Sequence, residues 1–203
     1  MNRSLATLFL APVAVVSLSG CGVNSIPTAE EQAKAKWADV QAAYQRRANL
    51  IPNLVATTKG SAASENQILT GVTQARANAT RITLSGDQLT DPEAMKRFQD
   101  AQNQLSAAII PFQRMQEAYP DLKSQANFQT LMSQLEGTEN RINIAIRDYN
   151  EAVQSYNTTI RTFPAVIGAK VIYGAKPMAT FQATTPNADR APTVDFGTGN
   201  SGG

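Results

Sequence analysis

The sequence predicts an all-α fold, an antiparallel bundle of three to four long helices followed by a disordered C-terminal tail. Three observations predict it. Apolar residues recur at steps of three and four over most of the chain, which places them on one face of a helix. Proline and glycine are concentrated where this pattern is interrupted. The last residues, from about 183 onward, are rich in Pro, Thr, Ala and Gly and carry little that offsets the entropy of ordering.

The first long helix is expected over residues 29–80. Thr28-Ala29-Glu30-Glu31 has the spacing of a capping box at its start. Pro52 predicts a kink rather than a break, because the apolar stripe stays in phase across it, and Gly60-Ser61 is a second weak point. The stripe consists of Trp37, Val40, Tyr44, Ala48, Ile51, Val55, Leu69, Val72, Ala75 and Ala79.

A second helix is expected after a polar loop over residues 83–90. Thr90-Asp91-Pro92-Glu93 is typical of a helix start, with proline at the first helical position, where its missing N–H has no cost. Tyr119-Pro120-Asp121 is expected to end the helix. Its buried face is Phe98, Ala101, Leu105, Ile109, Phe112, Met115 and Tyr119.

The third helix has a near-heptad apolar seam and is expected to end at Phe163-Pro164. A short helical turn is expected over residues 165–171. The seam consists of Phe128, Leu131, Leu135, Ile142, Ala145, Tyr149, Ala152, Tyr156, Ile160 and Phe163. Three helices with short connections fold back on one another to bury such stripes.

The N-terminus has the pattern of a bacterial lipoprotein signal. A positive residue, Arg3, precedes an apolar run too short to span a bilayer, and residues 1–20 are therefore expected to be a removed signal peptide. The run ends in Leu18-Ser19-Gly20-Cys21, an aliphatic residue, two small residues and a thiol that can accept the lipid. The alternative is an ordinary signal peptide followed by an incidental cysteine. Lipidation is favoured because Cys21 is the chain's sole cysteine.

These features predict the domain organisation and the location. Residues 21–28 are expected to be a lipidated tether, residues 29–182 the bundle, and residues 183–203 the tail. Acyl chains such as palmitate on Cys21 would anchor the protein to a membrane, facing the periplasm or the exterior. Gly22 follows the cysteine, and this favours the outer membrane if the source has two membranes.

Composition excludes several classes of function. The chain has no histidine, and its one cysteine is assigned to the anchor, so Ser-His-Asp and Cys-His catalysis and the usual zinc sites are excluded. Without residues 1–20 the chain has 17 basic and 16 acidic side chains and no concentrated basic face, which disfavours nucleic acid as a partner. Glycine-rich phosphate loops are absent. No cofactor and no metal are therefore expected.

Three segments together resemble the LemA family, and the resemblance extends over about residues 37–181. They are Arg46-Arg47-Ala48-Asn49-Leu50-Ile51-Pro52-Asn53-Leu54-Val55, then Glu117-Ala118-Tyr119-Pro120-Asp121-Leu122-Lys123, then Thr138-Glu139-Asn140-Arg141-Ile142 with Asp148-Tyr149-Asn150, Tyr156-Asn157 and Phe163-Pro164. The resemblance implies a helical bundle outside the cytoplasmic membrane, no known enzymatic activity, and a partner such as a membrane protease or a TPM-domain protein. LemA proteins usually begin with a transmembrane helix, whereas this chain has a lipobox. They often have histidine before the glutamate that matches Glu65, and Ser64 stands there instead.

Polar residues on the third helix are candidates for a binding groove. Asn140, Arg141, Asn150 and Asn157 either line a groove for a peptide or partner helix or form hydrogen bonds between helices, and the second interpretation is favoured. Tyr119 is either part of a recognition corner or, as favoured, packs on the end of the bundle.

Two further groups are interpreted as structural. Tyr44, Tyr149 and Tyr156 are expected in the core rather than in an aromatic binding stripe. Glu136, Glu139 and Arg141 are expected to be surface charge rather than an acid–base pair. Cys21 is therefore the only predicted site residue. The predicted function is a non-enzymatic envelope scaffold or adaptor that binds a partner protein through exposed helix faces. The alternatives are a carboxylate hydrolase acting on cell wall or peptide, and a small-ligand-binding bundle.

Overall fold

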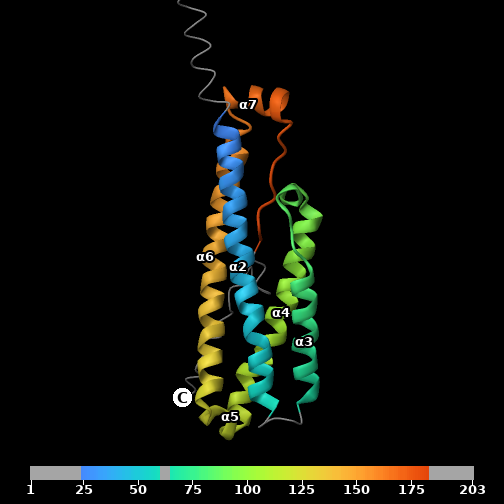
Figure 1. Cartoon of the computed structure of the whole chain (residues 1–203), viewed down its shortest axis with the longest axis vertical. Helices are drawn as coiled ribbons and strands as arrows, with labels where there is room; N and C mark the ends of the chain where they lie inside the picture. The colour runs from blue at the N-terminus through green and yellow to red at the C-terminus, as the bar shows by residue number, and fades with distance from the viewer. Residues whose placement is uncertain (1–23, 60–64, 183–203) are drawn as a thin grey trace, which may run out of the picture.

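The computed structural model describes residues 24–59 and 65–182 and confirms an all-α antiparallel bundle (Figure 1). The expected signal peptide, Cys21 and the expected tail at 183–203 lie outside the described residues. The long helices of the described chain are α2 (Ser25–Lys59), α3 (Asn66–Arg81), α4 (Pro92–Ala118) and α6 (Ala126–Thr159). Shorter elements are the 3₁₀-helix η1 (Gly86–Thr90), α5 (Pro120–Ser124), α7 (Ala165–Gly168) and the π-helical turn η2 (Ala169–Tyr173).

The prediction of one helix over residues 29–80 is wrong. The structure has two helices, α2 ending at Lys59 and α3 beginning at Asn66, which lie side by side and run in opposite directions (Figure 1). The helices are interrupted between Lys59 and Asn66 and not at Pro52, which stays inside α2. Folding back lets the stripe residues Leu69 and Val72 pack into the same lower core as Leu54. This burial favours the hairpin over one long, half-solvated helix.

The start of α2 also differs from the prediction. The helix begins at Ser25, so Ser25–Thr28 are helical and do not belong to a tether. Thr28 forms no capping box, because its hydroxyl donates to the Asn24 carbonyl oxygen at 2.8 Å. Glu31 instead forms an ion pair with Lys34. Ile26 and Ala29 are buried in the upper core, and their burial extends the helix beyond the local sequence signal.

A side chain from α3 compensates for the proline inside α2. Proline lacks the N–H that would bond to the carbonyl four residues earlier, here that of Ala48. The Ala48 oxygen instead accepts a hydrogen bond from Nε of Arg76 at 2.8 Å. Because α3 supplies the missing donor, α2 passes through Pro52 without ending.

The other helix boundaries follow the sequence more closely. Pro92 is the first residue of α4, and the Asp91 carboxylate accepts from the backbone N–H of Glu93 at 2.9 Å, so this predicted start is confirmed. Part of the expected 83–90 loop is the 3₁₀-helix η1. The third helix, α6, ends at Thr159, earlier than predicted. The sequence predicts Phe163 in the buried seam of this helix, and this prediction is wrong, because its side chain is 80% exposed.

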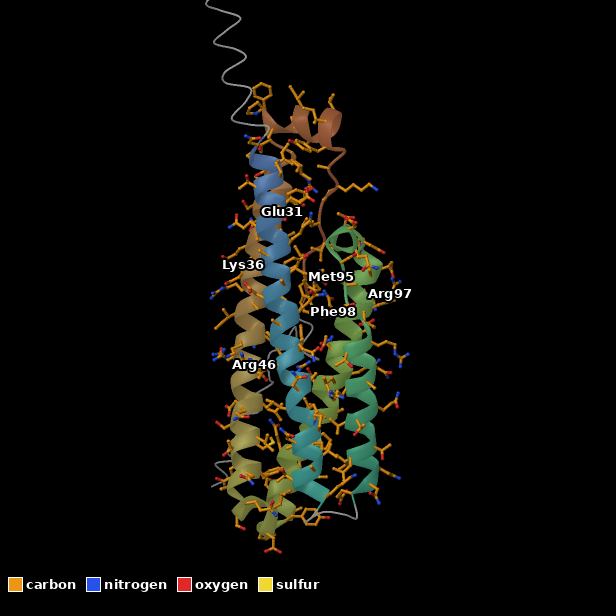
Figure 2. All side chains as sticks on the ribbon, viewed as in Figure 1. Glu31, Lys36, Arg46, Met95, Arg97 and Phe98 are labelled. Carbon is orange, nitrogen blue, oxygen red and sulfur yellow. The ribbon has the colours of Figure 1, made fainter. Side chains whose placement is uncertain are left out.

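The core has an upper and a lower part. The upper part joins the first half of α2, the second half of α6, the start of α4 and residues 175–181, and the lower part joins the remaining halves to α3. Figure 2 shows Met95 and Phe98 of α4 between the helices, whereas Lys36, Arg46 and Arg97 project outward. Each helix therefore buries an apolar stripe and solvates the rest.

Five aromatic side chains form the centre of the upper core. Trp37 lies 5.1 Å from both Phe98 and Tyr149, measured between ring centroids. Phe181, from the end of the described chain, contacts the rings of Trp37, Tyr44 and Phe98 at 6.1–6.3 Å. The core position predicted for Tyr44, Tyr149 and Tyr156 is confirmed, since all three are buried.

The buried tyrosines predict a loss of stability at alkaline pH. Burial raises the pKa of the Tyr44 and Tyr149 hydroxyls above the usual value of 10. Between pH 10 and the raised pKa the unfolded chain has lost these protons and the folded chain keeps them. The free energy of unfolding should therefore fall by about 1.4 kcal/mol per pH unit for each tyrosine as pH rises above 10. Urea unfolding between pH 9 and pH 11 measures this slope. Tyr149→Phe should make it shallower, and an unchanged slope would contradict the assignment.

Candidate functional site: the groove along α6

The chain returns along α6 after η2 as an extended segment, residues 174–182, called here the C-terminal segment. It lies between α6 and the α4 side of the bundle (Figure 1). The Tyr156 hydroxyl donates to the Lys176 carbonyl at 3.2 Å, and the Tyr149 hydroxyl donates to the Ala179 carbonyl at 2.9 Å. On its other side, the Ala179 N–H donates to the Leu89 carbonyl of η1 at 2.8 Å. The segment therefore bridges α6 and η1 by its backbone.

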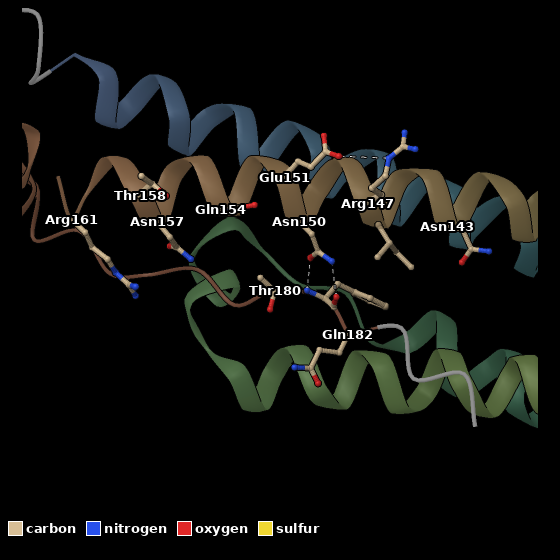
Figure 3. Close-up of a pocket in the computed structure, with 12 residues that line it drawn as sticks. Asn143, Arg147, Asn150, Glu151, Gln154, Asn157, Thr158, Arg161, Thr180 and Gln182 are labelled. Atoms are coloured by element: carbon tan, nitrogen blue, oxygen red, sulfur yellow. Dashed lines mark hydrogen bonds and ion pairs between the residues drawn. The ribbon is translucent and has the colours of Figure 1, made fainter. Parts of the chain in front are cut away.

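Two asparagines of α6 bind the backbone of this segment in the same way. Asn157 donates from Nδ2 to the Met178 carbonyl and accepts from the Met178 N–H, both at 2.9 Å. Asn150 does the same with the carbonyl and N–H of Phe181, both at 2.8 Å (Figure 3). Each side-chain amide thus pairs with one residue's N–H and C=O, as a neighbouring β-strand would.

The spacing of the two asparagines matches the repeat of an extended chain. Seven residues of helix separate Asn150 from Asn157, a rise of about 10.5 Å. Three residues separate Met178 from Phe181, about 10 Å of extended chain. The next position of the series is Asn143, seven residues before Asn150. We call Asn143, Asn150 and Asn157 the asparagine ladder.

Asn143 lies beyond the end of the described C-terminal segment. Its side chain is exposed and forms no hydrogen bond with any described residue. In Figure 3 it projects from the same side of α6 as Asn150 and Asn157. Among the described residues, no extended backbone pairs with this third position of the ladder.

A groove continues from Phe181 past Asn143 between α4 and α6. Its volume is about 970 Å³, and Ile109, Ile110, Met132, Leu135, Ile142 and Ile146 provide its apolar lining. A shallower hollow of about 800 Å³ runs beside the C-terminal segment (Figure 3). The two hollows share Asn143, Ile146 and Phe181, so they form one continuous surface.

A buried arginine lines the same groove. Arg47 of α2 is 2% exposed, and its Nη1 donates to Ser106 Oγ at 2.7 Å and to Glu139 Oε2 at 3.2 Å. Its Nη2 donates to the backbone and side-chain oxygens of Gln102 at 3.1 and 3.2 Å. The guanidinium carbon lies 5.0 Å from the ring centroid of Tyr44. Arg47 thereby joins α2, α4 and α6 where the groove begins.

The polar candidate residues of α6 and Tyr119 lie in three different environments. Asn150 and Asn157 do form structural hydrogen bonds, but to the C-terminal segment rather than to another helix. Asn140 and Arg141 are exposed and belong to neither hollow. Tyr119 packs at the lower end of the bundle as expected, and its hydroxyl donates to Glu65 Oε1 at 2.9 Å.

The charged cluster of α6 is arranged differently from the prediction. Glu139 is not plain surface charge, because it forms an ion pair with the buried Arg47. Glu136 lines the groove, whereas Arg141 does not. Sequence reasoning missed Arg47 and Asn143. The seven-residue spacing of the asparagines was a usable signal for Asn143. Helical phase was a usable signal for Arg47, which lies three residues after Tyr44 and four before Ile51, whereas Arg46 is out of phase with this stripe.

The described residues provide no metal centre and no membrane-spanning helix. They contain no group of three or more His, Cys, Asp or Glu side chains placed to hold a metal ion. None of their helices combines the length and apolar character needed to cross a bilayer.

Comparisons with known proteins identify the family. The chain is 27% identical to the magnetosome protein MamQ 2 of Paramagnetospirillum magneticum over 171 residues, which cover 76% of this chain and 63% of that protein. It is 27% identical to the magnetosome protein MamQ of Magnetospirillum gryphiswaldense, covering 79% and 65%, and 29% identical to protein LemA of Metamycoplasma hominis, covering 61% and 52%. The chain thus matches between about half and two thirds of the length of these relatives. The LemA family model matches residues 36–196, and the chain belongs to the LemA family.

Proposed function

We propose that this protein is a non-enzymatic, membrane-anchored adaptor that binds an extended peptide of a partner protein in the groove between α4 and α6. The observation that carries the proposal is the third rung of the asparagine ladder, Asn143, at the mouth of an apolar groove. The anchor is the lipid expected on Cys21. Two of the relatives are named magnetosome proteins, and this supports a location of the present protein at a membrane.

The C-terminal segment supports the choice of ligand. In the upper half of the bundle this groove already holds an extended chain, with backbone bonds to Asn150 and Asn157 and with Met178 and Phe181 buried. The lower half offers the same two elements, an asparagine amide for the backbone and apolar walls for side chains. A peptide that adds to an existing edge through its backbone, with pockets for alternate side chains, is a recurring mode of recognition.

The experiment is site-specific photocrosslinking in living cells. A benzophenone amino acid replaces Ile110, which lines the groove and is 49% exposed. The matched control is Ile144, which is 44% exposed and belongs to neither hollow. The probe at 110 should give an adduct that maps to one extended stretch of another protein, and the probe at 144 should not. Adding Asn143→Ala should reduce the yield of the adduct, whereas Asn140→Ala, on the exposed face of α6, should leave the yield unchanged.

Two outcomes would overturn the proposal. If the probe at 110 maps only to residues 183–203 of the same chain, the groove is filled internally. If positions 110 and 144 capture the same proteins, the groove has no selectivity.

The two alternative functions would use the same groove. A carboxylate hydrolase needs two convergent acids, and Glu117, Glu136 and Glu139 all line it. If the protein cleaved peptidoglycan or peptide and Glu136→Gln lost this activity, the hydrolase would be the correct function and the adaptor would not. If a small metabolite bound saturably and Ile110→Trp, which fills the groove, abolished this binding, the protein would be a ligand-binding bundle.

A further inference from the structure

The end of the bundle formed by α7 and η2 has an unusual distribution of side chains. Small residues face the bundle and are buried, namely Ala165, Gly168 and Ala169. The large apolar residues face outward and are 43–80% exposed, namely Phe163, Ile167, Val171, Ile172 and Tyr173. We call these five residues the apolar cap. A soluble helix normally has the opposite arrangement, so the cap requires a partner.

The position of the cap indicates which partner it meets. α7 and η2 lie at the end of the bundle where α2 begins (Figure 1). Cys21 precedes Ser25, the first residue of α2, by four positions, which at full extension span at most about 14 Å. A lipid on Cys21 would therefore hold this end of the bundle close to the bilayer. Figure 2 shows side chains on α7 and η2 that point away from the bundle at this end.

The charges around the cap agree with a lipid surface. Arg161, Lys170 and Lys176 are exposed around it. The sequence has no acidic residue between Glu151 and Asp189. Basic side chains around exposed aliphatic and aromatic residues favour binding at the interface of an anionic bilayer, and tyrosine is enriched at that level.

We infer that the apolar cap inserts into the surface of the membrane that carries the lipid anchor, so that the bundle stands on the bilayer by its α7 end. This inference extends the proposed anchor, since it adds a second, non-covalent contact and fixes the orientation. The groove then opens along the side of an upright bundle, and its lower end is the part farthest from the membrane.

The test uses a tether that does not depend on lipidation in cells. Residues 21–203 include every described residue and one cysteine, so Cys21 can be coupled uniquely to a maleimide lipid in vesicles of phosphatidylethanolamine and phosphatidylglycerol. Ile172→Trp places a reporter in the cap, and Ile144→Trp places a matched reporter on the exposed face of α6. Trp37 is buried and gives the same background in both chains.

Brominated acyl chains in these vesicles quench only a tryptophan that reaches the bilayer. The Trp at 172 should be quenched and its emission shifted to the blue, and the Trp at 144 should be unaffected. If neither reporter is quenched while the chain floats with the vesicles, the inference is overturned. The inference would also be overturned if the protein formed a dimer through the cap and the Trp at 172 were not quenched. The lipid anchor is tested separately by feeding cells labelled palmitate. If no label appears on the full chain, the proposed anchor is wrong, whereas the result for the cap in vesicles still holds.

Discussion

Replacing Phe181 by alanine is expected to lower the free energy of unfolding by about 3–5 kcal/mol, the usual cost of truncating a buried phenylalanine. The ring is 4% exposed and contacts Trp37, Tyr44 and Phe98. Its removal leaves a cavity in the upper core and weakens the hold on the C-terminal segment. Urea unfolding followed by circular dichroism measures the change.

Phe163→Ala is the matched control for this substitution. It removes the same atoms from a side chain that is 80% exposed. Its effect on stability in solution should stay within about 0.5 kcal/mol. If the two variants lose equal stability, Phe181 is not part of the core, and the account of the C-terminal segment fails.

Arg47→Ala is expected to cost about 3 kcal/mol, because it removes a buried ion-pair partner and leaves its neighbours unsatisfied. Gln102 loses two hydrogen bonds and Ser106 loses one, and the carboxylate of Glu139 loses its cation. Glu139 is 52% exposed and regains water, which keeps the loss below that of a fully buried pair. Arg47→Lys should recover little of this stability, because the single ammonium group of lysine cannot contact all the acceptors that the planar guanidinium reaches.

The neighbouring arginine provides the control. Arg46 is exposed and projects from α2 (Figure 2), so Arg46→Ala should change the free energy of unfolding by no more than about 0.5 kcal/mol. Equal losses in Arg46→Ala and Arg47→Ala, measured by urea unfolding, would contradict a structural role for the buried guanidinium.

Much of the fold could be predicted because the decisive interactions are local. Helical periodicity identified the stripes of α4 and α6, and Asp91-Pro92 identified the start of α4 to the residue. The break between α2 and α3 is not predicted, because periodicity alone cannot distinguish one helix from two whose apolar stripes are in phase. Arg76, which stabilises Pro52 from a different helix, has no local signature.

The candidate site depended on contacts between distant segments and was only partly predictable. The sequence predicts that Asn150 and Asn157 form structural hydrogen bonds, but it points to another helix as their partner and not to the C-terminal segment. The C-terminal segment has no periodicity, and nothing in its sequence indicates that it returns along α6. Phe163 was assigned by its phase to the core, and the early end of α6 instead turns it outward.

The most direct test of the account is the affinity of a peptide for the third rung of the asparagine ladder. The peptide is synthesised from the stretch captured at position 110, and its Kd is measured by calorimetry. Asn143→Ala should weaken binding about tenfold, because it removes hydrogen bonds worth about 1.4 kcal/mol. Asn140→Ala should leave the Kd unchanged. Equal Kd values for the wild type and Asn143→Ala would contradict recognition of an extended backbone by the ladder.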